Sequence, residues 1–262
     1  MGKRSVSPIR EDKVDVYKFT WNQIQRILEE AKKLKDPTIY EFLVVLAYSG
    51  RRVSEILGKF PPWKKDLSPK YIRKNFVKVY KVVGRDKKGN WIIDKSQYKY
   101  EFLPLHGLRW CDINFEKGII TWEIEKKIIR TVEEGEEWQK IRRKEVVLPA
   151  HPLVLQILKQ RYIRLKEEGK IGHETDRVFP FSRVYAYKVV KKLCEKAGIK
   201  NKERLLHAFR HGFAVEMLKR GSSSKDIERL CNYLQHSDIK ITMAYAKFTE
   251  NEEEIRKWLE KL

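Results

Sequence analysis

Residues 39–48, with the sequence IYEFLVVLAY, form a nearly all-apolar run in which Glu41 is the single charged residue. Pro37 precedes the run and Ser49-Gly50 follows it, so its length and boundaries predict a helix. A helix that is apolar on every side cannot lie at a protein surface, because part of it would face water. Other elements must therefore surround it, and a chain of 262 residues is long enough to build one large domain or two small ones around such a core.

The rest of the chain divides into helical and strand-forming segments. Period-two alternation predicts strands at 76–80 and 98–102 around a turn-rich segment at 84–90, and further strands at 118–124 and 145–149 joined by a charged connection over 126–144. Three-to-four spacing of apolar residues predicts helices at 22–34, 51–57, 152–167, 183–197, 206–220, 224–235, 238–246 and 250–261. We expect the segment Thr20-Trp21-Asn22 to cap the first of these helices, and Ser223 and Asp226 offer a capping box for the helix at 224–235. The pattern predicts a mainly α, α+β fold with a small antiparallel sheet.

Charge points to the class of partner. The chain has 57 Lys and Arg against 36 Asp and Glu, a formal charge of +21, and residues 59–107 hold 13 basic against 4 acidic residues, or +9 of that excess. Such a positive field favours a polyanion, because neutralised phosphates release counterions. The alternative is a charged surface typical of a thermophilic protein.

Other classes of protein do not fit the sequence. Charges interrupt every apolar run well before the ~20 residues of a membrane helix, and no hydrophobic stretch follows the basic amino terminus. Three widely spaced cysteines suggest neither a disulfide framework nor a zinc cluster. We therefore expect a cytoplasmic protein, in the nucleoid or, if a virus or plasmid encodes the chain, in the cytoplasm of the host cell, with no metal and no membrane partner.

Four segments carry the chemistry. His207 and Arg210 stand at i and i+3, on one helix face where both could reach a phosphate, although a solvated basic helix start would look the same. Taken together and in order, the segments resemble the tyrosine recombinase (integrase) family over roughly residues 20–262: SGRRVSEIL at 49–57, LRWCDINF at 108–115, HAFRHGFA at 207–214 and LQHSDIKITMAYAKF at 234–248.

This resemblance implies a role for each of six residues. Tyr245 would be the nucleophile, Arg52 and Arg210 would hold the scissile phosphate, His207 would take part in proton transfer at the tyrosine, His236 would donate a hydrogen bond to a phosphate oxygen, and Lys126 would be the general acid. Two alternatives stay open, Lys127 for the general acid and Arg51 for the first arginine, although the spacing Gly-x-Arg-x-Ser-Glu selects Arg52. Glu55 is expected to orient its neighbours.

The resemblance also implies a function. It predicts a site-specific recombinase or integrase that cuts and rejoins double-stranded DNA through a 3′-phosphotyrosyl intermediate, without a metal or cofactor. The alternatives are DNA relaxation of the type IB topoisomerase kind and a DNA-binding protein that has lost catalysis.

The domain organisation departs from the family in length. We expect a flexible basic arm at 1–18 and a catalytic domain at 19–262, with 59–107 as a basic β-hairpin insertion and without the family's amino-terminal core-binding domain. Either the chain is a fragment of a longer protein, or the insertion supplies part of the missing DNA grip. The helix at 250–261 has one apolar face and is the candidate for self-association into a dimer or tetramer on DNA, the alternative being that it packs on its own domain.

Overall fold

A computed structural model describes residues 19–60, 72, 76–133, 135–200, 205–236 and 239–246. The helices are α2 (Trp21–Lys32), α3 (Thr38–Ser49), α4 (Val53–Leu57), α6 (Pro152–Glu167), α7 (Arg183–Lys196), α8 (Leu205–Arg220), α9 (Ser224–Leu234) and α10 (Ile239–Ala246), with a short 3-10 turn η1 (Trp110–Asp112). The strands are β1 (Val77–Arg85), β2 (Trp91–Glu101), β3 (Ile113–Asn114), β4 (Ile119–Glu133) and β5 (Glu136–Pro149). The predicted arm at 1–18 and the predicted helix at 250–261 lie outside the described residues.

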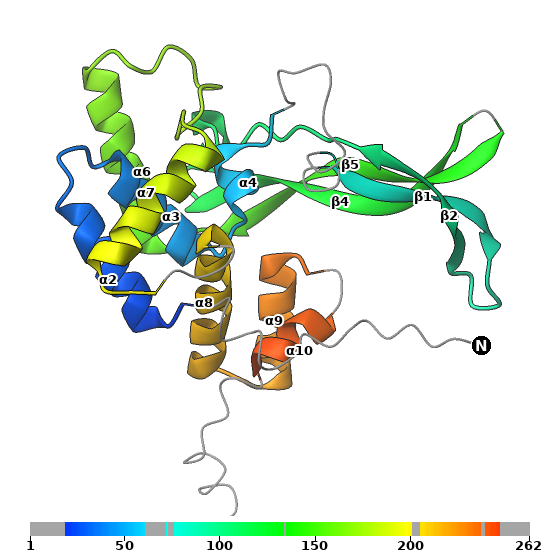
Figure 1. Ribbon diagram of the computed structural model, residues 1–262. Helices are drawn as coiled ribbons and strands as arrows, with labels where there is room; N and C mark the ends of the chain where they lie inside the picture. The colour runs from blue at the N-terminus through cyan, green and yellow to red at the C-terminus, as the bar shows by residue number, and fades with distance from the viewer. Residues whose placement is uncertain are drawn as a thin grey trace, which may run out of the picture.

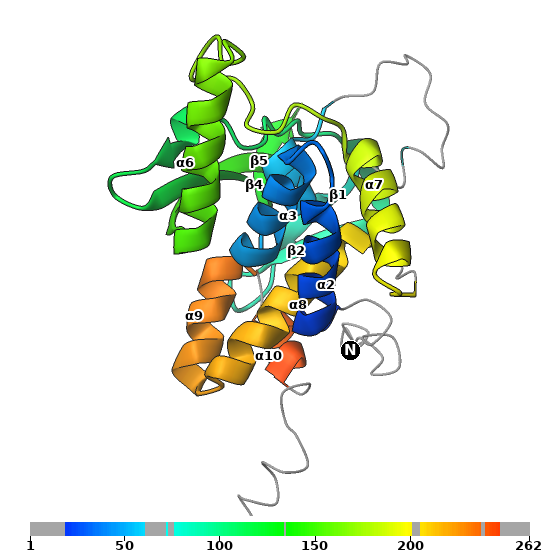
Figure 2. The same cartoon turned by 90° about the vertical axis from the view of Figure 1, so that its left-hand side faces the viewer.

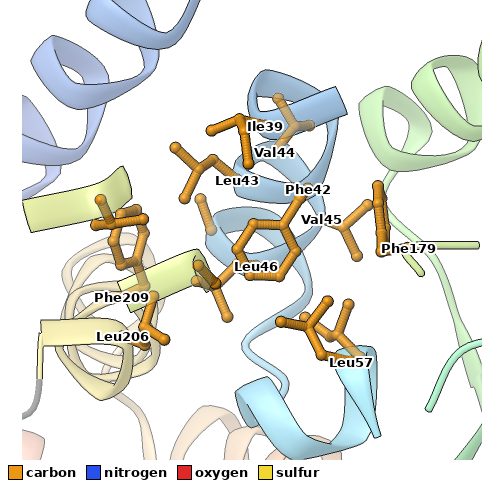
Figure 3. Close-up of a cluster of buried hydrophobic side chains, with 14 of the residues drawn as sticks. Ile39, Phe42, Leu43, Val44, Val45, Leu46, Leu57, Phe179, Leu206 and Phe209 are labelled. Atoms are coloured by element: carbon orange, nitrogen blue, oxygen red, sulfur yellow. The ribbon is translucent and has the colours of Figure 1, made fainter. Parts of the chain in front are cut away.

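The apolar helix lies at the centre of the helical part, as its composition predicts. Figure 2 shows α3 enclosed by α2, α6, α7 and α8. Residues 42–47 of α3 are all fully buried. Figure 3 shows their side chains meeting Leu57 of α4, Phe179, and Phe209 of α8. Each buried side chain of this size contributes about 1.5–3 kcal/mol, so this helix organises the main core.

The sheet is entirely antiparallel, with strand order β2-β1-β5-β4-β3. β4 and β5 pair in register from Ile119↔Pro149 out to Glu133↔Glu136, with one irregularity between Ile129 and Val132. The prediction of a charged connection over 126–144 is therefore wrong, since residues 126–133 and 136–144 continue the two strands. The prediction failed because charged side chains make the alternation of apolar residues weak over this part of the sequence.

The hairpins β1–β2 and β4–β5 form a hairpin arm, distinct from the segment 1–18, that extends away from the helices (Figure 1). β1 and β2 agree with the basic hairpin expected within 59–107, and both strands are longer than predicted. Residues 61–71 and 73–75 of that segment lie outside the described ranges. β1 joins the outer end of the β4–β5 hairpin, where Lys81 pairs with Trp138 and Val82 with Glu137 of β5.

Local signals set most helix boundaries correctly. Thr20 and Gln23 form a capping box at α2, and Ser223 and Asp226 form one at α9. The predicted helix at 51–57 begins two residues later, because Arg52 is extended and acts as the N-cap of α4. No helix among the described residues is long and apolar enough to cross a membrane.

A second, smaller apolar cluster lies apart from the main core. It joins α8, α9 and α10 through Phe213, Ala214, Val215, Leu218, Leu230, Leu234 and Tyr245. Tyr245, the predicted nucleophile, is thus packed within this cluster and held by its neighbours.

Candidate active site

Arg52 stands at the amino end of α4 and is held by a buried carboxylate. Its Nη1 donates to Glu55 Oε1 at 2.8 Å and its backbone N–H donates to Glu55 Oε2 at 2.9 Å. Glu55 is 2% exposed, whereas the Arg52 side chain is 40% exposed. The carboxylate therefore orients Arg52 as expected, and leaves part of its guanidinium open to a cleft of about 400 Å³ beside it.

Arg210 lies on α8 and is almost completely buried. Its Nη1 donates to Gly50 O at 2.8 Å and its Nη2 donates to Leu234 O at 2.7 Å. Burial, reinforced by the nearby Arg52, lowers the pKa of Arg210 to about 9. The guanidinium stays charged at neutral pH, and an anion beside it would offset part of the cost of burying it.

His236, which follows the end of α9, and Tyr245 of α10 lie close together. His236 Nδ1 is 2.8 Å from Thr242 Oγ1, and the centroids of the His236 and Tyr245 rings are 6.1 Å apart. Burial, followed by Arg210 and Arg52, lowers the pKa of His236 to about 3, so the imidazole is neutral at pH 7. Its ring can then carry one proton, and the protonated nitrogen can donate a hydrogen bond.

Tyr245 is buried. Its side chain is 4% exposed, and burial raises its pKa to about 12 although Arg210 and Arg52 oppose the rise. A phenol in this state is protonated and unreactive at neutral pH. Attack on a phosphate requires that the tyrosine reach the DNA and lose its proton there.

The ring of His211 contacts both His207 and Tyr245. The ring centroids of His207 and His211 are 4.5 Å apart, and those of His211 and Tyr245 are 5.3 Å apart. His211, interpreted from the sequence as a packing or secondary phosphate residue, therefore connects His207 of α8 with Tyr245 of α10.

Lys126 reaches the same place from the sheet. It follows Ile120, Trp122 and Ile124 with a period of two on β4, and those three residues are buried against the helices. Its Nζ donates to Gln235 O at 2.9 Å, next to His236. Burial, followed by Lys144 and Arg52, lowers the pKa of Lys126, which makes the ammonium a better proton donor. Lys127, the alternative general acid, is the next position of the strand, opposite Ile141.

The structure thus brings all six predicted residues to one region, from α4, β4, α8, the end of α9, and α10. The sequence left Arg51 as the alternative to Arg52 and did not show that Arg51 is buried. This residue is fully buried and donates through Nη2 to Tyr233 O, so the geometry favours Arg52 as the arginine that can meet a ligand. The adjacent arginines were visible in the sequence, but no sequence signal separates an inward from an outward guanidinium in an extended segment. Over the described part of the chain, no three His, Cys, Asp or Glu residues gather in a group that could hold a metal ion.

More than half of this chain matches a known protein family. The model of the phage integrase family matches residues 104–252, which include five of the six predicted residues and leave out Arg52 and the β1–β2 hairpin. Tyrosine recombinase XerH of Campylobacter jejuni is 25% identical over 183 residues, covering 69% of this chain and 49% of XerH. The chain spans half or less of the length of the curated relatives that it matches.

Solved structures show the same fold. The crystal structure of XerA recombinase aligns with a TM-score of 0.53 at 17% identity, covering 93% of this chain and 64% of XerA. XerH bound to its palindromic difH substrate, in a post-cleavage complex, aligns with a TM-score of 0.53 at 13% identity, covering 100% of this chain and 59% of XerH. Because the family model covers more than half of the 262 residues, this chain belongs to the phage integrase family.

Proposed function

We propose that this protein is a site-specific recombinase that cuts and rejoins double-stranded DNA through a 3′-phosphotyrosyl intermediate, without a metal. The observation that carries the proposal is the convergence of two arginines, a lysine, a neutral histidine and a tyrosine at one place from five separate segments. Strand transfer at a phosphodiester needs a nucleophile, cations at the phosphate oxygens and a proton donor for the leaving group, and this set supplies each. Relatives that are named tyrosine recombinases support it.

In the proposed reaction, the Tyr245 oxygen attacks phosphorus and the bond from phosphorus to the 5′ oxygen breaks. The phenolic proton passes to a base, a step in which His207 takes part, and Lys126 protonates the leaving 5′ oxygen. Arg52 and Arg210 hold the non-bridging oxygens, where a guanidinium can make two hydrogen bonds, and His236 donates another. The free 5′ hydroxyl of a second strand then attacks the phosphotyrosine, which restores the diester and the phenol.

We also propose a second DNA contact on the β1–β2 hairpin. Lys78 Nζ lies 3.4 Å from the centroid of the Tyr98 ring, and Arg85 lies 4.0 Å from that of Trp91. The exposed Tyr98 ring therefore lies beside an ordered cation, a combination that suits a phosphate backbone. An arm of this kind would grip DNA beyond the scissile phosphate. The proposal also includes action in the cytoplasm and self-association on DNA through residues 250–261.

Covalent capture tests the proposed function. The wild-type chain is incubated with a pool of nicked duplexes whose central base pairs are randomised, so that a cut strand diffuses away and traps the adduct. We expect protein-linked DNA from wild type and none from Tyr245→Phe, which should still bind duplexes. No adduct from wild type would refute catalysis and leave a DNA-binding protein.

Two further measurements use the captured duplexes. Adducts that resolve onto a second duplex indicate recombination, whereas rejoining of the same strand indicates topoisomerase-like relaxation. A duplex with a 5′-bridging sulfur needs no acid for its leaving group, so it should restore cleavage by Lys126→Ala. If this duplex restores cleavage by Lys127→Ala and not by Lys126→Ala, Lys127 is the general acid.

A further inference from the structure

Three cations from three separate segments donate to three consecutive carbonyl oxygens at the carboxyl end of α9. The pairs are Arg51 Nη2 with Tyr233 O, Arg210 Nη2 with Leu234 O at 2.7 Å, and Lys126 Nζ with Gln235 O at 2.9 Å. The last carbonyls of a helix lack partners within it and form the negative end of its dipole, so cations there are stabilising. The end of α9 is thereby tied to the segment before α4, to α8 and to β4.

Arg51 is the most deeply buried of the three cations, at 0% exposed against 2% for Arg210. Its side chain has no exposed surface, and its guanidinium lies 5.1 Å from the centroid of the Tyr233 ring. Its Nε is 3.4 Å from Ser49 O and 3.9 Å from Glu55 Oε2. Arg51 can therefore act on the site only through the groups that it holds.

The turn that Arg51 holds is strained. Gln235 has φ +56° and ψ 39°, the left-handed conformation that glycine adopts most easily, and His236 follows it directly. A non-glycine residue in this conformation costs about 1–2 kcal/mol and persists where surrounding contacts enforce it. The position of His236 thus depends on contacts that keep Gln235 in this turn.

We propose that Arg51 is a positioning residue, which fixes the last turn of α9 through Tyr233 O and so sets the place of His236 relative to Arg210 and Lys126. The inference rests on the proposed function for its catalytic meaning. When Arg210 and Lys126 turn toward a phosphate, the bond from Arg51 remains to hold the turn.

The test compares variants of the full chain. Arg51→Met removes the donor and keeps a long apolar side chain, whereas Arg51→Lys keeps one donor. Arg161→Met is the matched control, because Arg161 is also buried, donates from Nε to Val178 O at 3.0 Å and lies 5.0 Å from the Phe179 ring centroid, away from the site. A thermal melt of each variant establishes that it is folded at the temperature of measurement.

The first measurement needs no DNA. Histidine-labelled protein is titrated by NMR, with His236 assigned from the spectrum of His236→Gln. In Arg51→Met, the loosened turn exposes the His236 ring, and the substitution removes the nearby charge of Arg51. Both effects raise the pKa of His236. We expect an upward shift of about one unit or more in Arg51→Met, a smaller one in Arg51→Lys and none in Arg161→Met. An unchanged titration in folded Arg51→Met and Arg51→Lys would overturn the proposal.

The second measurement uses the captured duplexes in single-turnover cleavage. For Arg51→Met we expect an adduct rate that is lower by about 10- to 100-fold at saturating DNA, with affinity close to wild type, because a displaced histidine affects the reaction and leaves binding intact. Arg51→Lys should restore part of the rate, and so should Gln235→Gly in the Arg51→Met background, since glycine adopts the turn without strain. Weaker DNA binding with an unchanged saturating rate, or an equal loss in Arg161→Met, would refute positioning. If the wild type captures no DNA, the proposed function fails, while the titration of His236 still decides the role of Arg51.

Discussion

Replacing Glu55 by glutamine tests how the site balances its charges. Glu55 is a buried carboxylate next to Arg52 and Arg51, and its charge also acts on Arg210. Glutamine keeps the size of the side chain but carries no charge. One of its two terminal groups is an NH₂, so it must face an N–H donor where the carboxylate offered an oxygen.

The loss of stability can be worked out one interaction at a time. The pair with Arg52 Nη1, at 2.8 Å, is worth ~1 kcal/mol because that side chain is 40% exposed and screened by water. The Arg52 N–H loses a charged acceptor at 2.9 Å, and Arg51 loses the nearest compensating charge while fully buried, which together cost about 2 kcal/mol or more. We expect Glu55→Gln to lower the free energy of unfolding by about 3 kcal/mol.

Urea unfolding followed by tryptophan fluorescence measures this loss, with the m-value expected to stay constant. Glu41→Gln is the matched control, because Glu41 is also buried and pairs with Arg161 at 2.6 Å and Arg164 at 2.7 Å. Inorganic sulfate, added at constant ionic strength, should restore part of the stability of Glu55→Gln by binding the freed cations, and should restore less in Glu41→Gln. A loss below about 1 kcal/mol, or equal restoration in both variants, would show that Glu55 does not balance the charge of a phosphate site.

Three further predictions concern the histidine, a glycine and the arm. Folding lowers the pKa of His236 to about 3, so the stability that its neutral ring contributes is present above pH 6.5 and is lost as the pH falls toward 3. Between pH 7 and pH 5, the free energy of unfolding of wild type, measured in urea, should therefore fall by about 2 kcal/mol more than that of His236→Gln. An equal fall in the two proteins would contradict this. Gly50→Ala, where φ is +61° and a Cβ would lie 2.5 Å from Phe213, should cost about 2–4 kcal/mol in the same assay, whereas Gly89→Ala, with φ +78° and open space, should cost about 1 kcal/mol. Replacing residues 78–100 by an Asn-Gly turn should weaken duplex binding and reduce the slope of log K against log salt by about 0.9 for each phosphate that the hairpin neutralises. Unchanged binding would favour the alternative explanation of the net charge, a charged surface typical of a thermophilic protein.

Sequence alone determined the central helix and the family, and it selected six candidate site residues that the fold brings together. The run at 39–48 could be satisfied only by burial on all sides, and the structure buries it so. The motifs at 108–115, 207–214 and 234–248 are defined by residue spacings within each segment, so they can be recognised without the tertiary structure. The match of the family model to residues 104–252 confirms the family. Helix caps were predictable for the same reason, since a capping box is set within four residues.

Tertiary structure decided the extent of the sheet and the state of each charged group. Strand pairing over 126–144 depends on a partner strand, which charged side chains do not reveal. Arg51 and Arg52 are neighbours of the same type, yet Arg51 is buried against Tyr233 and Arg52 lines a cleft, because their contacts come from elements that are distant in the sequence. The pKa values of His236 and Tyr245 follow from burial and from arginines that are distant in sequence. Residue types and their spacing therefore identified the chemistry of this chain, whereas packing alone sets which cations are free to meet a phosphate and which hold the site together.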